Sequence, residues 1–352
     1  MSAQPKAPFS AESGSGGEFV RQPNRFVGRI TADARAASGE GPDAEGRWPL
    51  EPGRYRLVVS LACPWAHRAI IVRRLLGLTD AISLAVVDPL RDDRGWRFWL
   101  DDGHRDPVLG IEYLSEAYRR TDPDYAGRVT VPAIVDTVTG LVVTNDYPQI
   151  TLDLSTEWTA YHAPGAPDLL PADPAARAEH DALVADIFRD VNNGVYRAGF
   201  ATSQAAYEHA YDALFARLDA LSARLRTRRY LMGPAISEVD VRLFTTLVRF
   251  DAAYHGHFKC NRNKLTEDDV LWAYARDLFA LPGFGETVDF DHIKRHYYGT
   301  HESINPTGIV PKGPELHGWL TTHGREALGG RPFGDGTPPG PVRPEEAVPP
   351  LS

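Results

Sequence analysis

The sequence predicts an α/β domain followed by an all-helical domain. Up to about residue 160, short runs rich in β-branched residues alternate with segments whose apolar residues have helical spacing. A stretch rich in Pro and Gly at 163–174 then precedes a region with helical periodicity only. The length of 352 residues suffices for about two domains.

The first half predicts the order βαβ, α, ββα. Tyr-Arg-Leu-Val-Val at 55–59 is typical of a buried strand, and Pro132 lies at the start of a later strand, where a cis peptide bond is plausible. The expected elements are a strand at 55–59, a helix through 69–76, a strand at 81–87, an inserted loop at 88–106, a helix at 109–118, strands at 128–136 and 141–144 around a turn at 138–140, and a helix beginning near Asp146. Parallel strands joined by a helix and followed by a hairpin form an α/β pattern that ends antiparallel.

The second half predicts helices at 175–195, 204–226, 237–251 and 267–281. Two of them begin at sequences that resemble capping boxes, Ser237 to Asp240 and Thr266 to Asp269, to which we assign a structural role only. We therefore expect an N-terminal arm at 1–45 that is partly disordered, an α/β domain at 46–162, a helical domain at 163–330 and a disordered tail at 331–352.

Composition excludes several classes of partner. The formal net charge is -9, which argues against binding to nucleic acid or to an anionic membrane. Cys63 and Cys260 are the two cysteines, so no disulfide framework is expected, and a reducing cytoplasmic compartment fits best. We expect no signal segment in the polar first residues and no membrane span in the chain.

Cys63 is the most informative single residue. It lies where the strand at 55–59 ends and a helix begins, and Pro64 occupies the first helical position. At that position the helix dipole and the free N–H groups stabilise an anion, and His67 and Arg68 add basic neighbours, so the thiol ionises more easily. This pattern predicts a nucleophilic or redox cysteine; the alternative is a small buried apolar residue.

Several stretches together resemble one family. They are Cys-Pro-Trp-Ala-His-Arg at 63–68, Gly-Trp-Arg-Phe at 95–98, Asp-Val-Arg-Leu-Phe at 240–244, Tyr-His-Gly-His-Phe-Lys-Cys-Asn at 254–261, His-Tyr-Tyr at 296–298 and Ile-Asn-Pro-Thr-Gly-Ile-Val-Pro at 304–311. The βαβ–ββα order with Cys at the first helix resembles a thioredoxin fold, and the added helices resemble a glutathione transferase. The motifs resemble the glutathionyl-hydroquinone reductases, or Xi-class transferases, over residues 18–313.

The resemblance implies that Cys63 attacks the sulfur of a thiol-conjugated hydroquinone and expels the hydroquinone. The resulting mixed disulfide would then be resolved by a second thiol molecule. Ala66 stands where a second cysteine would allow an internal disulfide. By the same resemblance Tyr196 would give or accept the proton, and Tyr254 and Tyr297 would hydrogen-bond the thiolate and lower the pKa of Cys63. Without the resemblance, all three tyrosines would be assigned to packing.

The resemblance also places a thiol co-substrate along the α/β half. Trp96 would form an aromatic wall, Arg128 a charged contact, and Val131 would offer backbone groups to the co-substrate's peptide, with the intervening Val129 and Thr130 on the same edge. Cys260 and the histidines at 255, 257 and 296 would be structural, and no metal site is expected.

The chain departs from the family after its fourth strand. Glu-Ser is usual there and grips the γ-glutamyl end of glutathione, whereas this chain has Asp146 and Tyr147, followed by Pro148, which lacks a backbone donor. The thiol is therefore glutathione or, as this substitution and a composition typical of a GC-rich actinobacterial genome suggest, mycothiol. A conjugating transferase and a non-catalytic scaffold are the alternative functions. The family commonly forms homodimers.

Overall fold

The computed structural model describes residues 12–34, 41–349 and 351, and its contacts divide the chain into two compact units. Unit 1 contains Gln22–Pro164, and unit 2 contains Phe9–Arg21 together with Gly165–Ser352. The chain thus changes unit between residues 21 and 22 and again between 164 and 165. The domain boundaries expected from the sequence, including the disorder of the tail, stay predictions.

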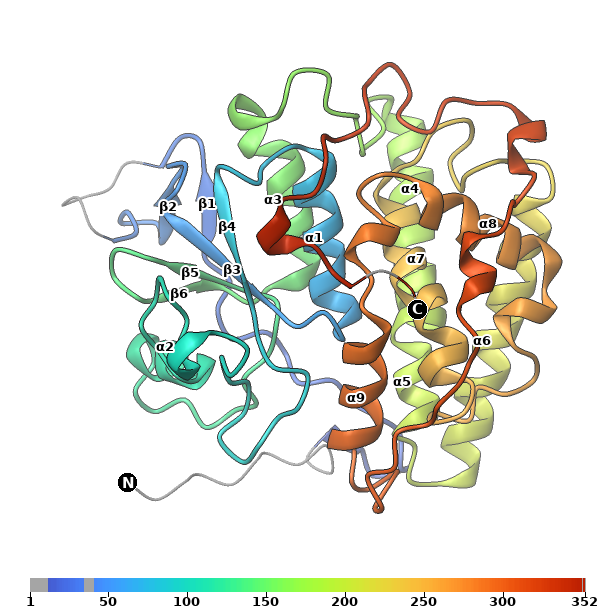
Figure 1. Cartoon of the computed structure of the whole chain (residues 1–352), viewed down its shortest axis with the longest axis horizontal. Helices are drawn as coiled ribbons and strands as arrows, with labels where there is room; N and C mark the ends of the chain where they lie inside the picture. Colours follow the sequence, from blue (N-terminus) through green and yellow to red (C-terminus); the bar gives the residue numbers. More distant parts are fainter. Residues whose placement is uncertain (1–11, 35–40, 350, 352) are drawn as a thin grey trace. The chain divides into compact units, whose positions relative to one another are not determined.

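Unit 1 is built on a four-stranded sheet in the order β4-β3-β5-β6, in which β3 pairs parallel with β4 and antiparallel with β5. Its elements are β1 (Arg29–Thr31), β2 (Arg47–Pro49), β3 (Tyr55–Val59), α1 (Pro64–Leu75), β4 (Ile82–Val86), α2 (Leu114–Thr121), β5 (Ala133–Asp136), β6 (Val142–Thr144) and α3 (Tyr147–Thr156). Helices α1 and α3 lie side by side on one side of the sheet, and α2 lies on the other (Figure 1). This is the thioredoxin-like arrangement that the order βαβ, α, ββα predicts.

Local chemistry explains most of these elements. All residues of β3 are buried, as its β-branched run predicts, and the peptide bond between Val131 and Pro132 is cis. The expected helix at 109–118 begins only at Leu114, so that prediction is wrong at its start. The Asp106 carboxylate accepts hydrogen bonds from the backbone N–H groups of Val108 and Leu109, and Gly110 has a φ of 65°. The chain therefore forms a turn there before helix α2 begins.

Unit 2 is helical within its described residues. It contains α4 (Pro174–Ile187), α5 (Gly194–Gly199), α6 (Gln204–Leu225), α7 (Glu238–Arg249), α8 (Asp269–Ala280) and α9 (Phe290–Thr300), with π-helical segments at Phe188–Asn192 and Phe250–Tyr254. Short 3₁₀ helices lie at Asp102–His104 and Trp158–Tyr161 of unit 1 and, in unit 2, at Leu265–Glu267, Gly285–Thr287, His317–Leu320, Arg325–Leu328 and Pro344–Glu346.

The sequence predicted the start of α7 correctly and that of α8 incorrectly. Ser237 and Asp240 form a reciprocal capping box, in which the Asp240 carboxylate accepts the Ser237 N–H at 2.9 Å. Thr266 instead lies inside a 3₁₀ turn, and Asp268 caps α8 by accepting the N–H groups of Val270 and Leu271. The single helix expected at 175–195 is divided by the first π-helical segment, and α9 was not predicted at all.

Candidate active site

Cys63 is positioned by the backbone at the junction of β3 and α1. It is the N-cap residue of α1, with extended backbone angles, and Pro64 is the first helical residue. Its N–H donates to Ser60 O at 3.0 Å and its carbonyl accepts the His67 N–H at 3.0 Å. The half-buried thiol lies with Sγ 3.4 Å from Val131 O. A thiol at a helix N-terminus is placed where its anion is stabilised.

The basic neighbours of Cys63 are enclosed within α1. His67 is fully buried, and Arg68 is 1% exposed. The Arg68 guanidinium carbon lies 4.6 Å from the centroid of the Trp65 ring. Arg68 therefore packs on the aromatic residue that follows Cys63 and Pro64, and its stem contributes to the packing of the helix start.

The chain before β5 is held by side chains from several parts of unit 1. Gln22 accepts the Arg128 N–H at 2.8 Å, and Tyr125 donates to Arg128 O at 2.7 Å. Tyr118 donates to Thr130 O at 2.8 Å, and Asn145 donates to Thr130 Oγ1 at 2.9 Å. Residues 128–131, all predicted to face the thiol co-substrate, therefore form a fixed edge that ends at Val131, whose carbonyl oxygen lies 3.4 Å from Cys63 Sγ.

Trp96 lies in the loop between β4 and α2. Its ring is 4% exposed, and the Arg91 guanidinium carbon lies 5.0 Å from the ring centroid. Its carbonyl accepts the Leu114 N–H at 3.0 Å, so the loop is attached to the first residue of α2. Arg128 is half-buried.

Asp146 and Tyr147 start α3. Asp146 is the N-cap residue, and its Oδ1 accepts a hydrogen bond from Asn24 Nδ2 at 3.0 Å. Burial raises the pKa of Asp146, and the bond from Asn24 opposes that shift. The Tyr147 ring packs on Trp65, with their centroids 4.7 Å apart. The Tyr147 ring therefore lies on the residue two positions after Cys63.

The first turn of α3 has a reduced supply of backbone donors. The Tyr147 N–H donates to Asn145 O, the N–H groups of Gln149 and Ile150 donate to Asp146 O, and Pro148 has no N–H. A helix N-terminus binds a carboxylate through such N–H groups. This site is consequently less suited to a ligand carboxylate than a helix start with a Ser hydroxyl and free amides.

The three predicted tyrosines come together in unit 2. Tyr196 comes from α5, Tyr254 ends the second π-helical segment, and Tyr297 comes from α9. The Tyr297 hydroxyl lies 2.6 Å from that of Tyr196 and 2.9 Å from that of Tyr254. We call these residues the tyrosine cluster. The π-helical segment adds a residue to the helical turn and so directs Tyr254 toward Tyr297; such bulges are frequent at functional sites.

The tyrosine cluster is buried. Tyr254 and Tyr297 are at most 1% exposed and Tyr196 is 7% exposed. Burial raises the pKa of both Tyr254 and Tyr297 well above the ordinary value, and the charge of Arg249 opposes this shift in both cases. The hydroxyls of Tyr254 and Tyr297 are therefore protonated at neutral pH and are able to donate hydrogen bonds.

Sequence reasoning missed Arg21, which contacts the tyrosine cluster. Its guanidinium carbon lies 4.9 Å from the centroid of the Tyr196 ring, and its Nε donates to Asn193 Oδ1 at 3.0 Å. The segment at 12–21 carries neither apolar periodicity nor a recognisable motif. A lone arginine in a polar segment gives no signal of such a contact.

The remaining candidates pack beside the tyrosine cluster: the Cys260 N–H donates to Tyr254 O at 3.0 Å, and the His257 ring lies 6.4 Å from that of Tyr297. Cys260 is fully buried, and burial raises the pKa of its thiol. His257 Nε2 lies 3.1 Å from His301 Nδ1, and burial lowers the pKa of His257 to about 4. Within residues 12–34, 41–349 and 351, no group of three or more His, Cys, Asp or Glu side chains is arranged to hold a metal ion.

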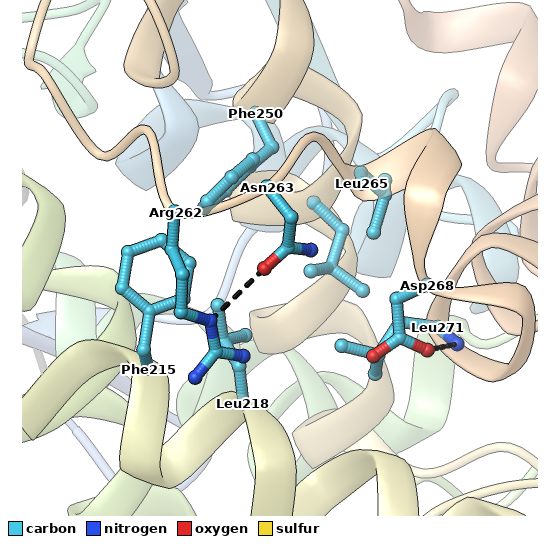
Figure 2. A pocket seen from close by; sticks show the side chains of 9 residues that line it. Phe215, Leu218, Phe250, Arg262, Asn263, Leu265, Asp268 and Leu271 are labelled. Atoms are coloured by element: carbon cyan, nitrogen blue, oxygen red, sulfur yellow. Dashed lines mark hydrogen bonds between the residues drawn. The ribbon is translucent and has the colours of Figure 1, made fainter.

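A pocket of unit 2 contains none of the predicted site residues. It lies between α6, α7 and the start of α8 and is lined by Phe215, Leu218, Leu247, Phe250, Arg262, Asn263, Leu265, Asp268 and Leu271 (Figure 2). The Arg262 Nε donates to Asn263 Oδ1 at 3.0 Å, and Asp268 Oδ1 accepts the Leu271 N–H at 2.9 Å. Its polar groups are thus already engaged with one another.

Comparisons with known proteins agree with this architecture. Models of the glutathione S-transferase N-terminal and C-terminal domains match residues 62–157 and 204–277. Glutathionyl-hydroquinone reductase YqjG of Escherichia coli is 43% identical over 304 residues, which cover 85% of this chain and 90% of that protein. Its glutathione-bound structure has a TM-score of 0.76 and covers 84% of this chain and 95% of that one.

Two further solved structures are similar. A glutathione transferase from Gordonia bronchialis has a TM-score of 0.86 at 60% identity, covering 91% of this chain and 96% of that one. An Xi-class transferase from Natrialba magadii has a TM-score of 0.79 at 41% identity, with coverages of 90% and 97%.

The fold and the comparisons define an enzyme with a thioredoxin-like N-terminal domain and a helical C-terminal domain, as in the glutathione transferases. Within that class, the chain belongs to the family of glutathionyl-hydroquinone reductases, the Xi-class transferases. Among the helices in the described part of the chain, none is both long and apolar enough to cross a membrane.

Proposed function

We propose that the protein reductively cleaves thiol-conjugated hydroquinones through a mixed disulfide on Cys63. The Cys63 thiolate attacks the thioether sulfur, an S–S bond forms, and the carbon–sulfur bond breaks with its electron pair on the ring carbon. A proton delivered to that carbon completes the released hydroquinone. A second thiol then attacks the mixed disulfide, which regenerates Cys63 and releases the thiol as its disulfide.

The placement of Cys63 supports this proposal most directly. The sulfur is at the start of α1, with Pro64 at the first helical position. The start of a helix favours the thiolate that the attack requires. Ala66 supplies no neighbouring thiol, so the mixed disulfide is left for an external thiol to resolve.

The tyrosine cluster is the proposed proton source. Tyr196 donates the proton to the leaving hydroquinone carbon, and Tyr254 and Tyr297 supply hydrogen bonds that stabilise negative charge on sulfur and on the departing group. The high pKa values of Tyr254 and Tyr297 support this role, because they keep both hydroxyls protonated.

The thiol co-substrate is proposed to bind along the edge that precedes β5. Val131 would pair its backbone with the co-substrate's peptide, with Arg128, Val129 and Thr130 alongside and Trp96 as the wall. Four side chains fix this edge through the Arg128 and Thr130 hydrogen bonds, which supports its use as a rigid template.

The thiol itself is proposed to be glutathione or, as a finer hypothesis, mycothiol. Glutathione is the ligand in the structure of the Escherichia coli relative. In this chain the Tyr147 ring lies on Trp65, and the amides of the first turn of α3 already donate to backbone carbonyls; both features disfavour the γ-glutamyl group. Mycothiol has no such group to place there.

Mass spectrometry tests the mechanism, and turnover rates with the two thiols test the identity of the co-substrate. We expect wild-type protein, exposed to a conjugated quinol and quenched before a second thiol is added, to gain the mass of one thiol on Cys63. Turnover with mycothiol should exceed turnover with glutathione, and Tyr147→Ser should reverse that preference. A quinol rather than a thiol on Cys63 would contradict the mechanism, and efficient turnover with glutathione alone would contradict the choice of mycothiol.

A conjugating transferase is the second candidate. Conjugation needs a hydroxyl that stabilises the co-substrate thiolate. In this chain Cys63 occupies the place of that hydroxyl, at the start of α1. Cys63→Ser should therefore abolish reductase activity and increase conjugation. Homodimer formation and a cytoplasmic location stay predictions.

A further inference from the structure

The N-terminal segment at 12–21 belongs to the helical unit and is anchored on it by backbone and side-chain bonds. Gly17 O accepts the Thr202 N–H at 2.9 Å, and Gly16 O accepts the Ser203 hydroxyl at 2.7 Å. The Phe19 side chain is 4% exposed, and its ring centroid lies 5.5 Å from that of Phe200. These contacts bring the end of the segment to α5.

Arg21 is fixed at that end over a ring of the tyrosine cluster. Its Nε donates to Asn193 Oδ1 at 3.0 Å, while its guanidinium carbon lies 4.9 Å from the centroid of the Tyr196 ring. Asn193 and Tyr196 are three residues apart at the start of α5 and so share a face. The amide therefore holds the cation in place over the aromatic face.

A cation in this position interacts more strongly with a phenolate than with a neutral phenol. It is attracted to the ring face in both states, and the Coulomb attraction to the oxygen charge is added once the proton has left. The cost of burying that charge is high at a residue that is 7% exposed. A fixed guanidinium therefore offsets part of the cost of proton donation.

Other groups around Tyr196 modify this effect but do not replace it. Tyr297 from α9 hydrogen-bonds the Tyr196 hydroxyl, and Tyr254 bonds Tyr297 in turn. Arg249, at the end of α7, favours the anionic forms of Tyr254 and Tyr297. The His301 ring lies 5.4 Å from that of Tyr297. Among these contacts, Arg21 is the cation that lies over the Tyr196 ring itself.

We propose that Arg21 is a positioning residue that stabilises the Tyr196 phenolate formed when Tyr196 donates its proton during hydroquinone release. This inference rests on the proposed role of Tyr196. The proton passes from the Tyr196 oxygen to the ring carbon as the carbon–sulfur bond breaks. The second thiol, which enters as RSH and leaves in the disulfide, returns a proton to Tyr196, so each cycle balances.

The test compares Arg21→Gln, Arg21→Lys and Arg25→Gln, the last at an exposed arginine four residues later in the sequence, which pairs with Asp122. In Arg21→Gln, kcat for hydroquinone release should fall about fivefold. The alkaline limb of the pH profile of kcat should move up by roughly half a pH unit, because the cation that favours the phenolate is gone. Arg21→Lys should keep most of the wild-type kcat. The KM for the thiol and the rate of Cys63 alkylation should stay the same, and Arg25→Gln should behave as wild type.

Double variants separate this proposal from a merely structural role. In a Tyr196→Phe background, Arg21→Gln should cause no further loss, because its effect acts through the tyrosine. Ser203→Ala, which loosens the segment without removing its charge, should leave the alkaline limb in place. An equal loss from Arg21→Gln in both backgrounds, or the same shift from Ser203→Ala, would overturn the proposal while leaving the Cys63 mechanism intact.

The proposed function itself can fail separately. Unchanged activity of Tyr196→Phe would remove the basis for the role of Arg21, whereas loss of the Cys63 adduct would contradict the mixed-disulfide mechanism. If Arg21→Gln does not fold, Arg21→Met replaces it, because it keeps a long side chain and removes the charge: an alkaline limb moved upward supports the proposal, and one that coincides with that of wild type overturns it.

Discussion

The cysteine of the α/β unit and the tyrosine cluster of the helical unit are held in place in opposite ways. Cys63 is half-buried at a strand–helix junction, and backbone bonds to Ser60 O and from His67 N fix it. The tyrosines come from three helical elements and are fixed by one another's hydroxyls in an almost fully buried environment. One site depends on local backbone geometry, and the other depends on packing between distant segments.

The difference matches the chemistry proposed for each site. A nucleophile has to be reached by substrate and a resolving thiol, so a partly exposed helix start suits it. A proton donor has to remain protonated, so burial that raises the pKa of Tyr254 and Tyr297 suits the tyrosine cluster. The following predictions test whether the two sites respond differently to substitution and to pH.

Cys63→Ser should have the largest effect. We expect hydroquinone release to fall by at least about a thousandfold, because no other group supplies the nucleophile. The rate is measured by the appearance of free hydroquinone at saturating thiol. Cys260→Ala is the matched control and should keep wild-type activity, since Cys260 is fully buried. Equal losses in the two variants would contradict the assignment of Cys63.

Tyr297→Phe should have the next largest effect. It removes the hydroxyl that bonds both other tyrosines, and kcat should fall about a hundredfold while the KM for the thiol changes little. Tyr274→Phe is the control: its buried hydroxyl bonds Asp240 at 2.7 Å in the same unit, so its loss should lower stability but leave kcat unchanged. Comparable kcat values for the two variants would show that the tyrosine cluster only packs the unit.

Asn145→Ala should affect thiol binding rather than turnover. It removes the bond to Thr130 Oγ1 and the acceptor of the Phe26 N–H, so the edge at 128–131 loses support. We expect the KM for the thiol to rise about fivefold with kcat nearly constant, as for loss of uniform binding. Thr137→Val removes a hydroxyl bond to Arg54 O just beyond the opposite end of β5 and should leave the KM unchanged.

Acid should weaken the helical unit through His257. Its pKa is lowered to about 4 by burial, with a smaller contribution from Lys259, so the unfolded chain binds a proton at a higher pH than the folded one. The contribution of neutral His257 to the free energy of unfolding is therefore fully present above about pH 6.5 and is lost as the pH falls toward about 4.

Urea unfolding at two pH values measures this effect. Between pH 7 and pH 5 the free energy of unfolding should decrease by roughly 2 kcal/mol through this residue. His257→Gln should reduce that dependence on pH, whereas His209→Gln, at an exposed position, should not. An unchanged slope in His257→Gln would mean that other groups determine the acid sensitivity.

The sequence predicted the α/β unit more fully than the helical one. The strand at 55–59 matches β3, the cis bond before Pro132 is present, and Cys63 precedes α1 as expected. Each of these features is encoded within a few residues. The start of α2 was displaced by the turn at Asp106, whose bonds to Val108 and Leu109 depend on a side chain that also pairs with Arg56 from β3.

The tyrosine cluster could be predicted only through resemblance. Tyr196 and Tyr297 are 101 residues apart, and periodicity carries no information about contacts at that distance. Helix α9 went unnoticed because its sequence, Phe-Asp-His-Ile-Lys-Arg-His-Tyr-Tyr-Gly-Thr, contains few aliphatic residues. Arg21 and the π-helical segments were missed because packing alone determines them.

The attachment of the segment at 12–21 has a consequence for how the chain is made. Arg21 meets Asn193, which is 172 residues later in the sequence, so the segment at 12–21 can dock only after α5 has been synthesised. The thioredoxin-like unit, which spans Gln22–Pro164, is synthesised in the meantime. The docking of Arg21 beside the tyrosine cluster is therefore a contact between residues far apart in the sequence, which belongs late in folding.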